Sequence, residues 1–330
     1  MNNREWLWQM TKDDGSGRPT VDWNAFGMIF NDPVNTYLKG TRVKGKTTLD
    51  RFGAAFSWPA DAIDGMPYVT EDNKAIPDIT KWKETLKIPD LETNCTDWTD
   101  ALKRKSEIDR DRQLVTAFSP DGIFERLHAL MGFEDTLMNF LLEPEAMMEL
   151  CNVLGDYKLR IFRMIIENLK PDMICHHDDW GAKDKLFMSP EIFREFIKPQ
   201  YEKIYGYAKE QGVLIMHHSD SFCEPLVEDM LDLGIDIWQG VLPQNNIVKI
   251  QKELNGKMIL MGGIDAGIVD RIDSTEDEIR KETRRACAAY MPGGCFIPCI
   301  TYGGPDSYLF PHVGAVLEDE LNAYLKETYC

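Results

Sequence analysis

One stretch of the sequence decides the fold: residues 172–218 read DMICHHDDWGAKDKLFMSPEIFREFIKPQYEKIYGYAKEQGVLIMHH. It begins and ends with a short apolar run, 172–177 and 213–218, each closed by a histidine pair. Between the runs, Ser189-Pro190-Glu191 predicts a helix start, because serine caps helix N-termini and proline fits the first turn. Gly212 predicts the end of that helix. The stretch therefore predicts a strand–helix–strand unit of a parallel sheet buried on both faces.

The same alternation continues along the rest of the chain. Further apolar runs bounded by turn residues occupy 113–118, 235–241, 257–263 and 295–300, with helices expected at 225–233 and 274–290. So many strand–helix units favour a closed barrel over an open sheet. The sequence predicts a single-domain (β/α)8 TIM barrel over residues 1–330, in which the turn-rich residues 1–110 form an irregular N-terminal extension that contributes to the substrate site.

Composition limits the partners. The 330 residues are 43% hydrophobic, with a net charge of −18, so a large core can form and nucleic acid or an anionic membrane is not expected as a partner. The acidity would attract a protein with a basic patch, or serve solubility alone. The sequence has no apolar run of membrane-spanning length, no secretion signal after Met1, and eight cysteines without a CxxC pair. These features predict a cytoplasmic protein with free thiols, and leave a homodimer open.

Polar residues gather where the predicted strands end, which is where barrel enzymes carry their chemistry. Four of the six histidines form the pairs His176-His177 and His217-His218. Because side chains alternate along a strand, one imidazole of each pair is expected to point to the barrel axis and the other away. Capping of strand ends is the alternative role. The density of polar groups favours a functional site.

A metal ion is the natural occupant of such a site. His218 and Asp220 are two residues apart, so they share a face, and Cys299 ends another predicted strand. Imidazole, carboxylate and thiolate suit Zn²⁺, and a catalytic zinc keeps three protein ligands and one open position. We therefore predict His218, Asp220 and Cys299 as zinc ligands. Cys175, Cys223 and Cys295 are expected to be structural.

Several segments together resemble the uroporphyrinogen decarboxylase superfamily over about residues 20–325. They are Asp178-Asp179-Trp180-Gly181, His218-Ser219-Asp220, Leu233-Gly234-Ile235-Asp236, Met261-Gly262-Gly263-Ile264-Asp265 and Gly293-Gly294-Cys295-Phe296-Ile297-Pro298. The resemblance implies a barrel enzyme from one of two branches. The decarboxylases carry an N-terminal arginine motif for propionate groups, which is missing from residues 20–45.

The other branch comprises corrinoid-dependent methyltransferases, whose thiol-specific members bind zinc through His-x-Cys and a later Cys. His218 matches the histidine, Cys299 falls within a residue of the later cysteine, and Asp220 departs from the pattern, which weakens thiol activation. Segments 217–221, 238–241 and 296–299 resemble most the methyl-donor-specific members, including O-demethylases that act on methoxylated aromatics such as veratrol. A ligand pattern of such enzymes also fits Glu92, Glu107 and His128 by spacing, although Glu107 lies in a charged helix.

The resemblance implies a methyltransferase that moves the methyl group of a methoxylated aromatic to Co(I) of a corrinoid. The corrinoid is expected on a separate protein, because this chain lacks Asp-x-His-x-x-Gly. A metal on the ether oxygen stabilises the leaving phenolate, and His177, Asp178 or His217 is expected to supply a proton or orient the ether. The expected substrate-binding residues are Asp179, Trp180, Trp238, Gln239, Asp265 and Tyr302.

Three alternatives remain from the sequence. The first is methyl transfer from a methylcorrinoid to a thiol or folate. The second is decarboxylation, as in the other branch. The third is a non-catalytic corrinoid-protein chaperone or ligand-binding barrel, for which no metal is expected.

Overall fold

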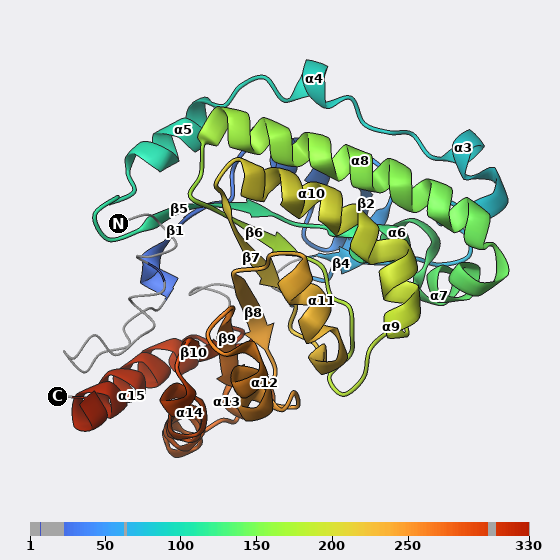
Figure 1. Ribbon diagram of the computed structural model, residues 1–330. Coiled ribbons are helices and arrows are strands. Elements are labelled where there is room, and N and C mark those ends of the chain that lie inside the picture. The colour runs from blue at the N-terminus through green and yellow to red at the C-terminus, as the bar shows by residue number, and fades with distance from the viewer. Residues whose placement is uncertain (1–6, 8–22, 63–64, 303–307, 330) are drawn as a thin grey trace.

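A curled parallel sheet forms the centre of the molecule (Figure 1). The computed structural model describes residue 7 and residues 23–62, 65–302 and 308–329. The seven strands are ordered β1-β5-β6-β7-β8-β9-β10, and every neighbouring pair is parallel. Their bounds are β1 (Phe26–Ile29), β5 (Leu114–Ser119), β6 (Met173–His177), β7 (Leu214–His218), β8 (Ile237–Val241), β9 (Ile259–Ile264) and β10 (Phe296–Ile300).

The expectation of a closed eight-stranded barrel is only partly correct. The described residues supply seven strands of this sheet, and its order ends at β1 and β10. The six apolar runs all became strands, whereas β1 lies in the part expected to be irregular. Inward side chains from all seven strands nevertheless form one apolar cluster, which also contains Trp23 of the 3-10 turn η1 (Trp23–Ala25) and Cys299 of β10. Apolar side chains thus fill the inside of the curled sheet, although β1 and β10 at its two ends do not pair with each other.

Helices cover the outer face of the sheet. The longest, α8 (Pro144–Leu169), packs against α10 (Lys198–Glu210), and the two lie side by side in Figure 1. The others are α6 (Ile123–Met131), α7 (Phe133–Leu142), α9 (Pro190–Ile192), α11 (Val227–Asp232), α12 (Ile247–Leu254), α13 (Ala266–Val269), α14 (Glu276–Tyr290) and α15 (Pro311–Tyr329), with short turns η3 (Phe193–Ile197), η4 (Glu224–Leu226) and η5 (Met291–Gly293). Within the described ranges, no helix combines the length and apolarity that a membrane crossing requires.

The helix expected from Ser189 to Gly212 starts as predicted but is interrupted. The Ser189 side chain accepts a hydrogen bond from the Ile192 amide at 3.3 Å, which caps α9. A π-helical turn, η3, then separates α9 from α10, and Pro199 stands at the start of α10. Proline lacks the amide hydrogen that would bond to the carbonyl four residues earlier, so the regular α-helical pattern is interrupted at this position.

The N-terminal part has more structure than the sequence predicts. After β1 it contains α2 (Pro33–Lys39), an antiparallel sheet of β2 (Lys46–Leu49), β3 (Ala55–Trp58) and β4 (Met66–Pro67), and the short helices η2 (Ile79–Lys81), α3 (Trp82–Thr85), α4 (Leu91–Asn94) and α5 (Thr99–Ser106). Its apolar side chains, among them Phe52, Ile76 and Leu91, belong to the same buried cluster as α8 and α10. This part therefore shares the core of the sheet and its helices.

Candidate functional site

The two histidine pairs stand side by side on neighbouring strands. His176 pairs in register with His217, and His177 with His218. The alternation of β6 and β7 places Met173, Cys175, Leu214 and Met216 in the inner cluster, so His177 and His218 share the inward face. His176 and His217 face outward and are fully buried. The predicted division of each pair into one inward and one outward imidazole is confirmed.

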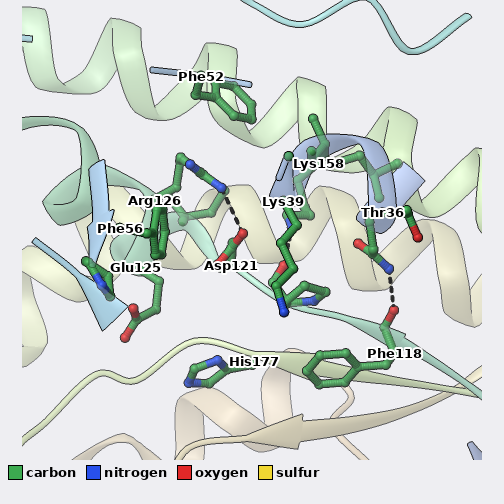
Figure 2. A pocket seen from close by; sticks show the side chains of 18 of the residues that line it. Thr36, Lys39, Phe52, Phe56, Phe118, Asp121, Glu125, Arg126, Lys158 and His177 are labelled. Atoms are coloured by element: carbon green, nitrogen blue, oxygen red, sulfur yellow. Dashed lines mark hydrogen bonds and ion pairs between the residues drawn. The ribbon is translucent and has the colours of Figure 1, made fainter. Parts of the chain in front are cut away.

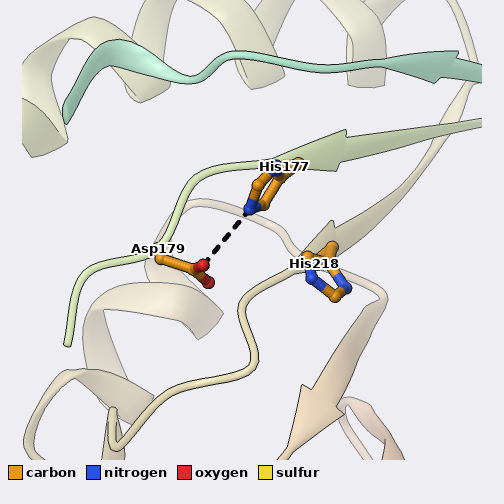
Figure 3. A group of neighbouring side chains, drawn as sticks. All are labelled: His177, Asp179 and His218. Atoms are coloured by element: carbon orange, nitrogen blue, oxygen red, sulfur yellow. Dashed lines mark hydrogen bonds and ion pairs between the residues drawn. The ribbon is translucent and has the colours of Figure 1, made fainter. Parts of the chain in front are cut away.

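The inward histidines meet a carboxylate. His177, Asp179 and His218 each offer one ligand atom, and these atoms all lie within 4.8 Å of one another (Figure 3). The rings of His177 and His218 are 4.8 Å apart between centroids. His177 Nε2 lies 3.3 Å from Asp179 Oδ2, and the other carboxylate oxygen accepts the Asp220 amide at 3.0 Å. In the part of the chain that the structure describes, this is the one group of three metal-ligand side chains at such distances.

The three side chains of this group differ in charge. Burial opposes a charged imidazole at both positions, but Asp179 outweighs it at His177 and raises the pKa of that imidazole to about 10. Although burial disfavours the Asp179 carboxylate, His177 lowers its pKa below the ordinary value. Burial and the neighbouring His177 lower the pKa of His218 to about 4. Without a metal, the site is thus a His177–Asp179 ion pair beside a neutral His218.

The hydrogen bonds of His218 suit a metal ligand. Its Nδ1 bonds to Gln239 Oε1, while the Gln239 amide nitrogen donates to the Thr301 carbonyl at 3.3 Å. Since the amide nitrogen of Gln239 is used, its oxygen faces His218, so Nδ1 carries the proton and Nε2 keeps its lone pair. Such an outer partner fixes the tautomer of metal-binding histidines.

Two imidazoles and one carboxylate also match the donor set of a catalytic zinc, which keeps a fourth position open. Zinc bonds of about 2.0–2.1 Å place tetrahedral ligand atoms about 3.4 Å apart. Side-chain rotation over little more than an ångström would close the present group around an ion. The residues therefore fit zinc.

The predicted ligand set overlaps with this group only at His218. Asp220 adjoins it, and burial together with the Asp179 carboxylate raises the pKa of Asp220 to about 8. Cys299 faces the interior from β10, three strands away from β7 in the sheet order. Burial raises the pKa of its thiol to about 12. His177 and Asp179 take the remaining places, and their spacing of two residues after a strand is the same signal that pointed to His218 and Asp220.

The outward groups form a wall behind the site. His217 Nδ1 accepts from the Tyr205 hydroxyl at 2.7 Å, its Nε2 donates to the Asp178 carbonyl at 3.2 Å, and burial lowers the pKa of His217 to about 3. The Asp178 carboxylate accepts the amides of Phe124 and Glu125 at the start of α6, at 3.1 and 2.8 Å. It also accepts from Trp180 and Tyr201. Both residues are enclosed, although the sequence predicts them as proton donors.

The predicted substrate-binding residues lie in different places. Trp180 stacks on His217 at 4.1 Å between centroids, Trp238 donates to the Ser219 carbonyl, and both indoles are completely buried, so neither offers a face to a ligand. Asp265 caps α13 through the Gly267 amide at 2.9 Å. The Tyr302 hydroxyl donates to Asp270. Of this set, Asp179 belongs to the His177–Asp179–His218 group, and Gln239 adjoins it through His218.

The alternative ligands Glu92, Glu107 and His128 do not gather. Glu92 pairs with Arg160, Glu107 approaches Arg104, and His128 lies 2.9 Å from Glu125. Each has a local partner on the protein surface or on its own helix. The spacing match with a demethylase ligand pattern is therefore not accompanied by a shared site in this conformation.

A cavity of about 550 Å³ opens beside the His177–Asp179–His218 group, which we call the metal-type group, and His177 lines this cavity (Figure 2). Its walls come from α2, β3, β4, α6, α8 and the ends of β1 and β5. Aromatic side chains line much of it: Phe30, Phe52, Phe56, Phe118 and Tyr157. The cavity size suits a small organic ligand. Residues 30–67 supply part of its lining, and the contribution of the N-terminal part to a substrate site stays a prediction.

Comparisons with known proteins agree with this architecture. A family model described as uroporphyrinogen decarboxylase (URO-D) matches residues 47–298. No curated protein matches the chain. A solved methyltransferase from Methanosarcina mazei is similar, with a TM-score of 0.57 and 16% identity over 91% of this chain and 79% of that one, which shows a shared fold. The catalytic domain of a GH26 endo-beta-1,4-mannanase from Bacillus sp. JAMB-750 aligns over 99% and 92% at 13% identity, but its TM-score of 0.42 supports no argument.

Proposed function

We propose, from the premise that the chain belongs to the uroporphyrinogen decarboxylase family, that it is a metal-assisted methyltransferase. The methyl donor in this proposal is a methoxylated aromatic, and the acceptor is the reduced corrinoid of a separate protein. One observation carries the proposal: a His177–Asp179–His218 group of zinc-type ligands adjoins a cavity lined by aromatic side chains.

Zinc bound at this group would supply a Lewis acid for the ether oxygen, which makes phenolate a better leaving group. The chain's own residues prepare that position. Gln239 holds His218 in the tautomer that binds a metal. His177 loses its proton when it becomes a ligand, so we assign it to the metal in place of proton transfer.

Asp178 and His217 have positioning roles in this proposal. Both are sealed behind the site and neither lines the cavity. Asp178 holds the start of α6, and α6 contributes Ile123, Glu125 and Arg126 to the cavity wall. Asp220 and Cys299 remain candidate ligands for a rearranged site.

The test combines metal analysis with turnover. The purified protein should contain about one zinc per chain, and a screen of methoxylated aromatics with a reduced corrinoid partner should yield a methylated corrinoid and the corresponding phenol. His218→Ala should remove the metal and the transfer together. Full transfer by a metal-free His218→Ala variant would overturn the proposal.

A second candidate, decarboxylation of a carboxylate-bearing substrate, is favoured by a separate observation. Four cationic side chains line the cavity: Lys39, Arg42, Arg126 and Lys158. The same preparation should therefore be incubated with uroporphyrinogen. Release of CO₂ without any corrinoid would favour decarboxylation over methyl transfer.

A further inference from the structure

The cavity has an unusual charge for this chain. The protein carries a net charge of −18, yet Lys39, Arg42, Arg126 and Lys158 line one cavity together with only two carboxylates, Asp121 and Glu125. A concave, partly apolar site lined mainly by one sign of charge concentrates ligands of the opposite sign. The net charge of the protein would repel an anion. The local excess of cations therefore indicates that this cavity is suited to an anionic ligand.

Lys158 is the cavity cation that is buried and has N–H donors available for a ligand. Its residue is 7% exposed, and its ammonium donates to the Pro120 carbonyl at 2.7 Å. Across the described ranges it makes no ion pair. An ammonium has three N–H donors, so two are left for a ligand. Burial lowers the pKa of Lys158 to about 8. The Asp121 carboxylate opposes this shift without outweighing burial. A buried ammonium that forms no direct ion pair is costly, and an anionic ligand would relieve that cost.

Two of the neighbouring cations are already held in place. Arg126 bonds to Asp50 and, at 2.8 Å, to Asp121, and its guanidinium lies 4.4 Å from the Phe52 ring centroid. Arg42 lies 4.0 Å from the Phe56 ring centroid. These contacts stack the arginines on the aromatic wall. They fix positive charge near Lys158, and the carboxylates of Asp50 and Asp121 bond to Arg126.

On the other side of the cavity from Lys158, Figure 2 shows Phe118 and His177, and Phe118 gives that side an apolar face. Phe118 faces inward from β5 and packs with Phe30 at 5.3 Å between centroids. His177 lines the same cavity and belongs to the metal-type group. A ligand between these walls meets an ammonium at one end, an aromatic ring along its side and the candidate metal at the other.

We infer that the cavity takes an aromatic ligand that carries a carboxylate, with Lys158 as the anion-binding residue. The inference deepens the proposed function and rests on it: the methyl donor is a methoxybenzoate-type anion. The charged group lies at Lys158, the ring lies against Phe118, and the methoxy group points towards His177.

The test compares two probes of similar shape by calorimetry, without corrinoid. We expect 3,4-dimethoxybenzoate to bind about 10- to 100-fold more tightly than 1,2-dimethoxybenzene, as one charge-assisted contact provides. Lys158→Met should abolish that preference. Lys249→Met is the matched control, because Lys249 is an exposed lysine on α12 that pairs with Glu224, outside the cavity. It removes the same charge and should keep the preference.

Equal affinity of the native protein for the two probes, or no binding of the benzoate, overturns the inference, and this comparison needs no variant. An unchanged preference in folded Lys158→Met overturns the role of Lys158. Failure of the proposed function looks different: the benzoate preference persists while no methyl transfer occurs. Conversely, methyl transfer from neutral methoxyarenes alone keeps the function and rejects the anionic donor.

Discussion

The outward pair, His176 and His217, differs sharply from the inward pair, His177 and His218, although the four residues occupy two neighbouring strands. The outward imidazoles are completely buried, and burial lowers both of their pKa values. His176 Nδ1 bonds to the Ser119 carbonyl at 2.7 Å, and His217 bonds to Tyr205. The inward imidazoles are half-buried beside Asp179.

This difference teaches that strand geometry assigns the roles. Side chains alternate across a strand, so identical dipeptides deliver one histidine to the packed outer layer and one to the interior. The outer histidines have their polar atoms satisfied within the fold. The inner ones keep lone pairs and charge for a ligand. The predictions below test that division.

The largest effect is expected from His218→Ala. Losing one of three ligands should weaken zinc binding by about a thousandfold or more, beyond the 10- to 100-fold that loss of an outer partner typically causes. Elemental analysis and competition with a chelator measure it. His217→Ala is the control from the same strand, and equal loss of zinc in both variants would contradict the division of roles.

His217→Ala should act on stability. The change removes a buried ring and leaves the Tyr205 hydroxyl without its acceptor, so the free energy of unfolding should fall by about 2–4 kcal/mol. Urea denaturation measures this. Zinc affinity should stay within about threefold of the native value, because His217 contributes no ligand atom. A free energy of unfolding equal to that of the native protein would show that the outward His217 does not stabilise the fold.

Gln239→Leu should have an intermediate effect on metal binding. It removes the acceptor that fixes the His218 tautomer, and loss of such a partner costs about 10- to 100-fold in metal affinity. Gln239→Glu keeps an oxygen at that position and should remain closer to the native affinity. Chelator titration of both variants measures the difference in zinc affinity. If Gln239→Leu binds zinc as tightly as Gln239→Glu, Gln239 does not hold His218 for the metal.

The smallest effect concerns the pH dependence of the metal-free protein. The pKa of His177 is raised from 6.5 to about 10, so its ion pair stabilises the fold fully below pH 6.5 and loses this contribution as the pH rises towards 10. We expect a loss on the order of 1 kcal/mol, because water reaches the half-buried pair. Urea midpoints at pH 6.5 and 10 measure it, and Asp179→Asn should flatten the dependence.

The sequence predicts the strand–helix alternation well because buried runs and glycine stops are local signals. Gly212 and Gly234 adopt positive φ values of 73° and 72° where the expected helices end. It misses β1 because residues 26–29 are a short run within turn-rich sequence. Closure of the barrel is only partly predicted: the described strands curl but their order ends at β1 and β10, and strand pairing between distant segments has no local signature.

The candidate site shows the same limit. The inward direction of His177 and His218 follows from alternation, and so does the shared face of residues two apart. The choice between Asp179 and Asp220 as the nearer carboxylate depends on how the two loops turn after β6 and β7. The cluster of cations around the cavity joins α2, α6, α8 and a loop, which only the folded chain brings together.

Asp178 connects the candidate metal site to the wall of the cavity. Its backbone adjoins Asp179 of the metal-type group, while its carboxylate grips the first turn of α6. A substitution of Gly122, which precedes α6, would drive a Cβ atom to 2.1 Å from the Asp178 side chain, so the two segments are in direct contact. The loop that carries Asp179 and the helix that lines the cavity are thus held together by direct contacts. A displacement of the Asp179 loop would therefore be transmitted through Asp178 to the start of α6, which lines the cavity.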